Sequence, residues 1–153
     1  MGPYVGKQTG ETALLWNLLE HFKLGDVMIA DRLYTSYFMI ARLKQLGVDV
    51  VMRQNESRHT DFRRGRRLGA RDHVVLWDRP VRPPWMDEAT YAGMPATLTM
   101  REVRAGGWTL VTTLIDPKSV SKMNWSSSTT AAGMWSSISA PSRTSCRWMC
   151  CAA

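Results

Sequence analysis

The sequence predicts a mixed α/β protein in which a parallel α/β core is followed by an antiparallel, β-rich insertion. Two observations carry this prediction. Between residues 9 and 55, short apolar runs alternate with segments of helical periodicity, as in a strand–helix–strand unit. Between residues 73 and 116, β-rich stretches alternate with turn signals. The chain of 153 residues has room for one domain, or for part of a larger one.

The first predicted element is an amphipathic helix over residues 9–25, with Thr9 as its N-cap and Gly25 as its C-terminal stop. Its apolar face, at helical spacing, consists of Leu14, Leu15, Leu18, Leu19 and Phe22. An apolar run over residues 26–30 follows and predicts a fully buried strand.

A second helix and a second strand complete the core. After the turn "DRLYTS", residues 36–47 predict an amphipathic helix and residues 48–54 a buried strand. Strand, helix and strand of this length predict a parallel pair with a right-handed crossover. Asp31 then lies just past the carboxyl end of a parallel strand, where open α/β sheets bind their ligands. Its carboxylate suits Mg²⁺, and the alternatives are pairing with Arg32 or capping of the next turn.

The segment after the core is strongly basic. The chain has 20 Lys and Arg against 13 Asp and Glu, and the excess is local. Such a cluster attracts polyanions, nucleic acid first among them, and the alternative is a solvated basic loop. The stretch "RHTDFRRGRRLGAR" holds Arg58, Arg63, Arg64, Arg66, Arg67 and Arg71.

The β-rich stretches follow the basic segment. Residues 73–80, 97–105 and 108–116 predict strands, and the last two flank a turn at Gly106-Gly107. We expect these strands to be antiparallel. The neighbouring histidines His59 and His73 are candidate DNA contacts. The aromatic residues expected to cluster inside the insertion are Phe62, Trp77, Trp85 and Tyr91.

Two stretches carry a resemblance to a known family: "GDVMIADRLYTSYFMIARLKQLGVDVVMRQ" and, after it, "RRGRRLGARDHVVLW". Over about residues 2–122, the chain resembles the catalytic domain of DDE transposases from bacterial insertion sequences. The resemblance implies a ribonuclease H-like fold with a β-rich insertion. It also implies cutting and joining of DNA strands by two Mg²⁺ ions that two Asp and one Glu hold. Asp31 matches the second Asp of this triad, and Arg32 and Tyr34 beside it are candidate contacts to the DNA backbone.

The resemblance divides the chain into a partial ribonuclease H-like core (1–55), a basic β-rich insertion (56–106), a return strand to the core (107–122) and a tail (123–153). The first Asp of the triad is expected well upstream of Asp31, and only thirty residues precede Asp31. Asp26 cannot replace it, because Asp26 begins the strand that Asp31 follows. We therefore expect no strand cleavage by this chain alone.

The tail lacks the periodicity of the preceding residues. Residues 123–153 contain eight Ser, all three Cys and no Asp or Glu. The family motif Tyr-x2-Arg-x3-Glu-x6-Lys, which supplies the third carboxylate, is expected near Lys122. Read one nucleotide earlier, the codons of the tail permit this motif, with its Glu across Trp135 and Ser136. The tail is interpreted as out of frame, through a lost nucleotide or a programmed slip, and the alternative is an irregular or disordered Ser-rich tail.

The remaining predictions concern compartment and partners. No apolar run approaches the roughly 20 residues of a membrane span, and the N-terminal residues lack the apolar core of a signal peptide. The patterned part has no Cys, which favours a cytoplasmic location. The predicted function is that of a transposase fragment that binds DNA and is inactive alone. The alternatives are a non-catalytic DNA-binding remnant, which interferes with intact transposase by occupying DNA ends or by forming homo- or mixed dimers, and a decayed product that does not fold stably.

Overall fold

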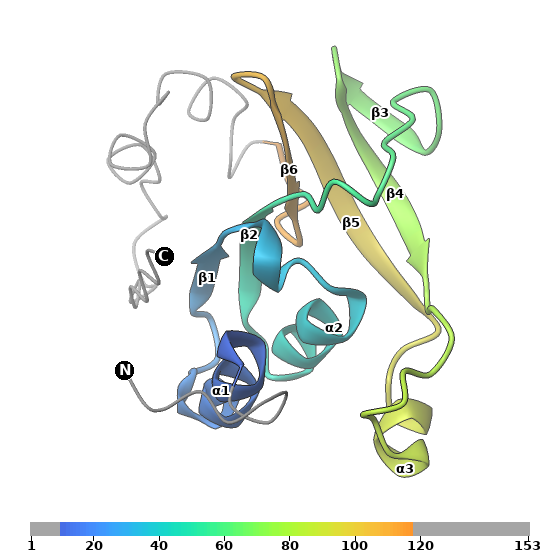
Figure 1. Cartoon of the computed structure of the whole chain (residues 1–153). Helices are drawn as coiled ribbons and strands as arrows, with labels where there is room; N and C mark the ends of the chain where they lie inside the picture. Colours follow the sequence, from blue (N-terminus) through green and yellow to red (C-terminus); the bar gives the residue numbers. More distant parts are fainter. Residues whose placement is uncertain (1–9, 118–153) are drawn as a thin grey trace.

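The computed structural model describes residues 10–117, which form one six-stranded mixed sheet with helices against one end of it (Figure 1). The strand order is β1-β2-β6-β5-β4-β3. The strands are β1 (Val27–Ala30), β2 (Asp49–Arg53), β3 (Arg66–Gly69), β4 (Asp72–Asp78), β5 (Thr97–Ala105) and β6 (Trp108–Thr112). The helices are α1 (Glu11–Leu18), α2 (Tyr37–Gln45) and α3 (Glu88–Ala92), with short 3₁₀ turns η2 (Leu19–His21) and η3 (Arg32–Tyr34). The predicted mixed α/β class is confirmed.

The β1–α2–β2 unit forms as its sequence pattern predicts. β1 and β2 pair in parallel, with Met28 opposite Val50. The Ser36 hydroxyl accepts a hydrogen bond from the Met39 amide at 3.2 Å and so caps the first turn of α2. The inner face of α2, which includes the fully buried Ile40, shares one apolar core with the strands. Local signals therefore suffice for this unit.

The first helix is shorter than predicted. α1 ends at Leu18, and the chain continues as a 3₁₀ turn. Leu15 and Leu19 are buried, whereas Leu14 and Leu18 are 47% and 39% exposed. The predicted apolar face is therefore wrong at Leu14 and Leu18, because each precedes a buried leucine and points about 100° away from it on the helix. Phe22 is partly buried against the core. The predicted N-cap is also replaced, since Gly10 occupies that position and Thr9 lies outside the described residues.

The β-rich segment continues the same sheet. β6 pairs antiparallel with β2, placing Thr112 opposite Val51, and β5, β4 and β3 follow as antiparallel neighbours. The long strands β4 and β5 extend away from α1 and α2 (Figure 1). β3, at the edge, is four residues long and has a register irregularity between Arg67 and Gly69. The antiparallel prediction is thus confirmed for the described strands.

The aromatic residues do not gather inside the insertion. Trp85 contacts Trp16 of α1 edge-to-face, with ring centroids 5.7 Å apart, and Tyr91 lies 6.1 Å from Phe38 of α2. The predicted cluster is wrong because the segment between β4 and β5 folds back onto the helices. The Tyr37 hydroxyl fixes this segment by donating to the Pro95 carbonyl at 2.7 Å.

Two further predictions meet the limits of the described range. The tail 123–153, with the expected Glu at Trp135 and Ser136, lies outside residues 10–117. Within residues 10–117, none of the helices has the length and apolar character needed to cross a membrane.

Candidate nucleic-acid interface

Asp31 occupies the predicted position at the carboxyl end of β1. It precedes η3 and is exposed to solvent, and its side chain does not cap that turn. Arg32 forms its ion pair with Glu56, so the alternative pairing with Asp31 is not observed. Within residues 10–117 the Asp31 carboxylate has no hydrogen bond or ion pair, and it is open to a ligand from solvent.

The described residues do not fit a Mg²⁺ site. No three His, Cys, Asp or Glu side chains in this range converge closely enough to hold a metal ion. Glu56, on the loop after β2, is already neutralised by Arg32. Two-ion chemistry at a phosphodiester needs several carboxylates around both ions, and Asp31 is one ligand of such a set at most.

The segment that carries Asp31 is joined to the start of the basic segment. The Thr35 hydroxyl donates to the Arg53 carbonyl at the end of β2, at 2.6 Å. Together with the Arg32–Glu56 ion pair, this bond places both segments at the carboxyl ends of the parallel strands. A cleft of about 180 Å³ lies there, and its lining includes Thr35, Asn55, Ser57, Arg58, Trp77 and Asp78.

The arginine cluster is divided between a loop, a strand and a turn. Arg58, Arg63 and Arg64 precede β3, whereas Arg66 and Arg67 lie on it. Neighbouring strand residues point to opposite faces, so these two side chains leave the sheet edge in opposite directions. Charged side chains on an edge strand also discourage pairing with other chains. The prediction of a single basic loop is therefore wrong for the second half of the cluster.

Two of the arginines are engaged with carboxylates. The Arg58 Nε lies 3.6 Å from Glu102 Oε1, and the guanidinium stacks on Trp77 at 3.9 Å from the ring centroid. The Arg63 Nε donates to Asp61 at 3.0 Å. Hydrogen bonds from the Arg63 side chain and backbone hold the pKa of Asp61 below its ordinary value. These two guanidinium groups are partly neutralised before any ligand binds.

The other four arginines of the cluster are exposed and, within residues 10–117, form no ion pair with a carboxylate. Their side chains are available to phosphate oxygens, whose charge an arginine matches with paired hydrogen bonds. Arg67 donates from Nε to the neutral Gly69 carbonyl, at 3.3 Å. The four residues are Arg64, Arg66, Arg67 and Arg71.

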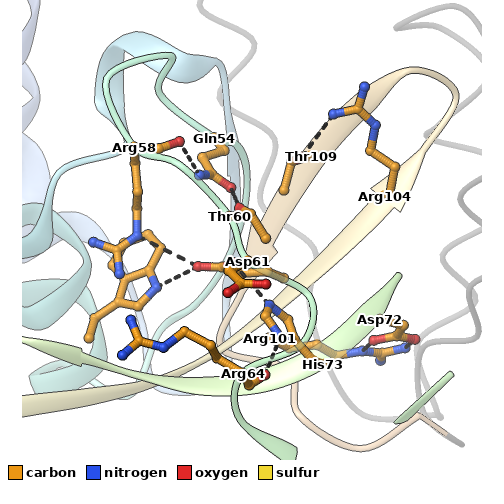
Figure 2. A network of polar contacts seen from close by, with 12 residues as sticks. Gln54, Arg58, Thr60, Asp61, Arg64, Asp72, His73, Arg101, Arg104 and Thr109 are labelled. Carbon is orange, nitrogen blue, oxygen red and sulfur yellow. Dashed lines mark hydrogen bonds and ion pairs between the residues drawn. The ribbon is translucent and has the colours of Figure 1, made fainter. Parts of the chain in front are cut away.

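A further arginine lies beside this group and was missed from the sequence. Arg104 is exposed on β5, and its amide N–H donates to the Arg71 carbonyl at 2.9 Å. Its guanidinium donates to the Thr109 hydroxyl at 3.3 Å (Figure 2). The antiparallel register creates this proximity, which a separation of 33 positions in the chain does not reveal.

Two candidate DNA contacts are withdrawn from the surface. Tyr34 is 5% exposed, and its hydroxyl lies 3.4 Å from Glu11. His73 is 1% exposed and bound on both ring nitrogens, so its predicted contact with DNA is wrong. Arg32 stays at the surface, where it is paired with Glu56, and His59 is exposed.

A buried polar network beneath the loop was not predicted. Glu102, 2% exposed, accepts a hydrogen bond from the Trp77 indole at 2.8 Å and contacts His73 Nε2 at 3.0 Å. On the other face of β5, Arg101 donates to both oxygens of Asp72, at 2.9 and 2.7 Å. One signal in the sequence could have revealed these buried charges: Arg101 and Glu102 are adjacent and oppositely charged within a β-rich stretch. Because neighbouring strand residues point to opposite faces, one of the two must face the core.

No family model, curated protein or solved structure matches the chain. A functional assignment therefore depends on the residues and their geometry.

Proposed function

We propose that the chain is a DNA-binding fragment of a DDE transposase of the bacterial insertion-sequence type, with a partial ribonuclease H-like core. It does not cleave DNA strands by itself. The observation that carries this proposal is the set of exposed arginines that form no ion pair with a carboxylate in the described range, Arg64, Arg66, Arg67 and Arg71. Arginines in this state can exchange the counterions of DNA for direct phosphate contacts, which is the main source of non-specific affinity.

The position of Asp31 supports the family assignment. An exposed carboxylate at the carboxyl end of a parallel strand is placed for a ligand. The insertion that carries the arginines starts at the same edge of the sheet, after β2. Because no three His, Cys, Asp or Glu side chains of the described residues converge to hold a metal ion, strand cleavage is not part of the proposed activity.

The mode of binding follows from the side chains. Phosphate contacts position a protein on DNA but do not read its sequence. The exposed arginines lie on an edge strand and the segments flanking it, and no helix carries them. We therefore expect binding that depends steeply on salt and little on base sequence.

The test compares two triple variants of the full chain with the same change in charge. Arg64, Arg66 and Arg67 become Gln in one, and Lys23, Arg42 and Lys44 become Gln in the control. The control side chains are exposed on and before α2, outside the arginine group. We expect the first variant to bind DNA more weakly. The negative slope of log K against log salt should become shallower by between about 0.9 and about 2.7, because each phosphate that is no longer neutralised removes about 0.9 from its magnitude. Equal reductions of affinity in both variants would show that these arginines act only through the net charge of the protein, and would contradict the proposal.

A further inference from the structure

The loop of residues 58–64, which precedes β3, rests on a buried carboxylate that contacts three partners. Glu102 lies under the loop, and its Oε1 accepts from Trp77 at 2.8 Å and lies 3.6 Å from the Arg58 Nε. Its Oε2 lies 3.0 Å from His73 Nε2. The other ring nitrogen, Nδ1, lies 2.6 Å from the carbonyl oxygen of Arg64 (Figure 2). The pair therefore contacts the loop at two arginines, one through a side chain and one through the backbone.

The partners of the His73 ring define where its protons lie. A carbonyl oxygen only accepts, so the Nδ1 atom facing Arg64 carries a hydrogen. In a neutral ring, Nε2 would then turn a lone pair towards the Glu102 carboxylate, and the two would repel. The 3.0 Å contact is favourable when one further proton lies between Nε2 and Oε2, on either atom. Both contacts of the ring are satisfied together when the pair shares this proton, and in that state the pair has no net charge.

Removal of this proton would loosen the loop at Arg64. If the ring kept its hydrogen on Nδ1, Nε2 would repel Glu102, and if the hydrogen moved to Nε2, the bond to the Arg64 carbonyl would break. The start of this stretch is also held by Gln54, which donates to the Arg58 carbonyl at 2.6 Å and accepts from Thr60 at 2.7 Å, and by the Asn55 carbonyl, which accepts from the Arg58 amide at 3.1 Å. These bonds fix the start of the loop but do not reach Arg64.

Few other charged groups face the pair. Arg58 is the cation on the loop side, and Phe62 covers the imidazole with its ring centroid 4.9 Å away. Asp61, on the same loop, is paired with Arg63. The ion pair of Arg101 and Asp72 involves side chains of the opposite face of the sheet. The proton between His73 and Glu102 is therefore the variable element of the network.

We propose that Glu102 and His73 are positioning residues that hold residues 58–64 in their DNA-binding arrangement by means of one shared proton. This inference rests on the proposed DNA-binding function. Its expected pH dependence follows from the charge and the geometry together. Deprotonation of the pair adds a negative charge beneath the arginines and loosens the loop that carries Arg64, so DNA binding weakens as the pH rises.

The variant that tests the proposal is Glu102→Gln. A glutamine can accept from Trp77 through Oε1 and donate from Nε2 to the lone pair of a neutral His73 ring. It thereby preserves the bond of His73 Nδ1 to Arg64 without the additional proton. A His59→Gln background removes the exposed histidine next to Arg58, so that this side chain does not contribute to the comparison.

DNA affinity of the full chain is measured from about pH 5 to about pH 9 at constant salt, in the His59→Gln background with and without Glu102→Gln. We expect Kd to rise on the order of tenfold with pH when Glu102 is present, and to change less than about twofold in the glutamine variant. Parallel curves for the two proteins would overturn the proposal. Thermal unfolding of both proteins at each pH verifies that folded forms are compared.

A second readout does not depend on DNA. Long-range ¹H–¹⁵N spectra of the imidazole report the protonation of both His73 nitrogens, and amide hydrogen exchange reports the protection of residues 58–64. We expect the ring transition and the decrease in loop protection to occur at the same pH, and to be absent for the loop in Glu102→Gln. If these transitions occur but the chain binds no DNA at any pH, the proposed function fails and the role of Glu102 and His73 in positioning the loop is retained. Loop protection that does not change together with the protonation of the His73 ring would refute that positioning role.

Discussion

Arg71 and Arg104 are neighbours through their backbones, because the Arg104 amide N–H donates to the Arg71 carbonyl at 2.9 Å. Arg71 occupies the turn between β3 and β4 with a positive φ of 54°, and Arg104 is near the end of β5. The bond brings two exposed guanidinium groups from distant parts of the chain to one end of the sheet. The basic surface therefore extends beyond the cluster that the sequence displays.

The first prediction concerns Arg104. Arg104→Gln should reduce the magnitude of the negative slope of log K against log salt for DNA by about 0.9, because the variant neutralises one phosphate fewer. Lys44→Gln, an equal change of charge on the exposed side of α2, should leave the slope unchanged. Salt titrations of both variants provide the test, and identical slopes would exclude Arg104 from the interface.

The buried ion pair of Arg101 and Asp72 makes a prediction about stability. Asp72→Ala should lower the free energy of unfolding by about 3–5 kcal/mol, because a guanidinium that is 1% exposed would be left without this charge partner. Replacing both residues, Asp72→Leu with Arg101→Met, should cost less than the single change. Urea unfolding of the three proteins tests this order, and an equal or larger destabilisation in the double variant would contradict it.

Trp85 should stabilise the fold despite being 64% exposed. It contacts Trp16 and Phe38 edge-to-face, with ring centroids 5.7 and 6.1 Å away. Trp85→Ala should therefore cost about 1–3 kcal/mol, since each aromatic pair contributes roughly 0.5–1.5 kcal/mol beyond its buried area. Leu76, which is also 64% exposed, provides the matched control, and Leu76→Thr should change the free energy of unfolding by less than about 0.5 kcal/mol. Similar destabilisation by both variants would argue against a stabilising role of the aromatic contacts.

Asp87 predicts a specific dependence of stability on acid. Its carboxylate accepts from the Thr90 amide at 2.8 Å and from the Thr90 hydroxyl at 2.6 Å, and these bonds lower its pKa in the folded state. The stability they add is therefore present above the pKa of the unfolded chain and is lost as the pH falls through the lower, folded pKa. Asp87→Asn should flatten the acid limb of a stability–pH curve. An unchanged acid limb would show that the cap is not formed in solution.

The sequence predicts those features whose causes are local. The apolar run after Asp26 and the periodicity of residues 36–47 predict β1–α2–β2, because each signal acts within a few residues. The run of leucines misled the prediction of α1, because spacing alone does not distinguish the face that Leu15 buries from the face that Leu14 exposes. Asp31 was placed correctly because a strand end determines its position.

The features that were missed depend on long-range register. Glu102 meets His73 across an antiparallel pair, and Trp85 reaches α1 through a segment that folds back onto the helices. Arg58 looked like a free phosphate ligand, yet its charge is shared with a carboxylate 44 positions along the chain. Composition predicts that arginines gather, but only the fold decides which of them are already paired.

The measurement that tests the central claim most directly is the salt dependence of DNA binding by the full chain, from about 50 mM to about 200 mM KCl. If the four exposed arginines of the cluster and Arg104 each contact one phosphate, the slope of log K against log salt is about −4.5, and a scrambled duplex of equal length binds with the same affinity. Binding that is absent, or whose slope is near zero, would contradict the claim that these arginines form a nucleic-acid interface.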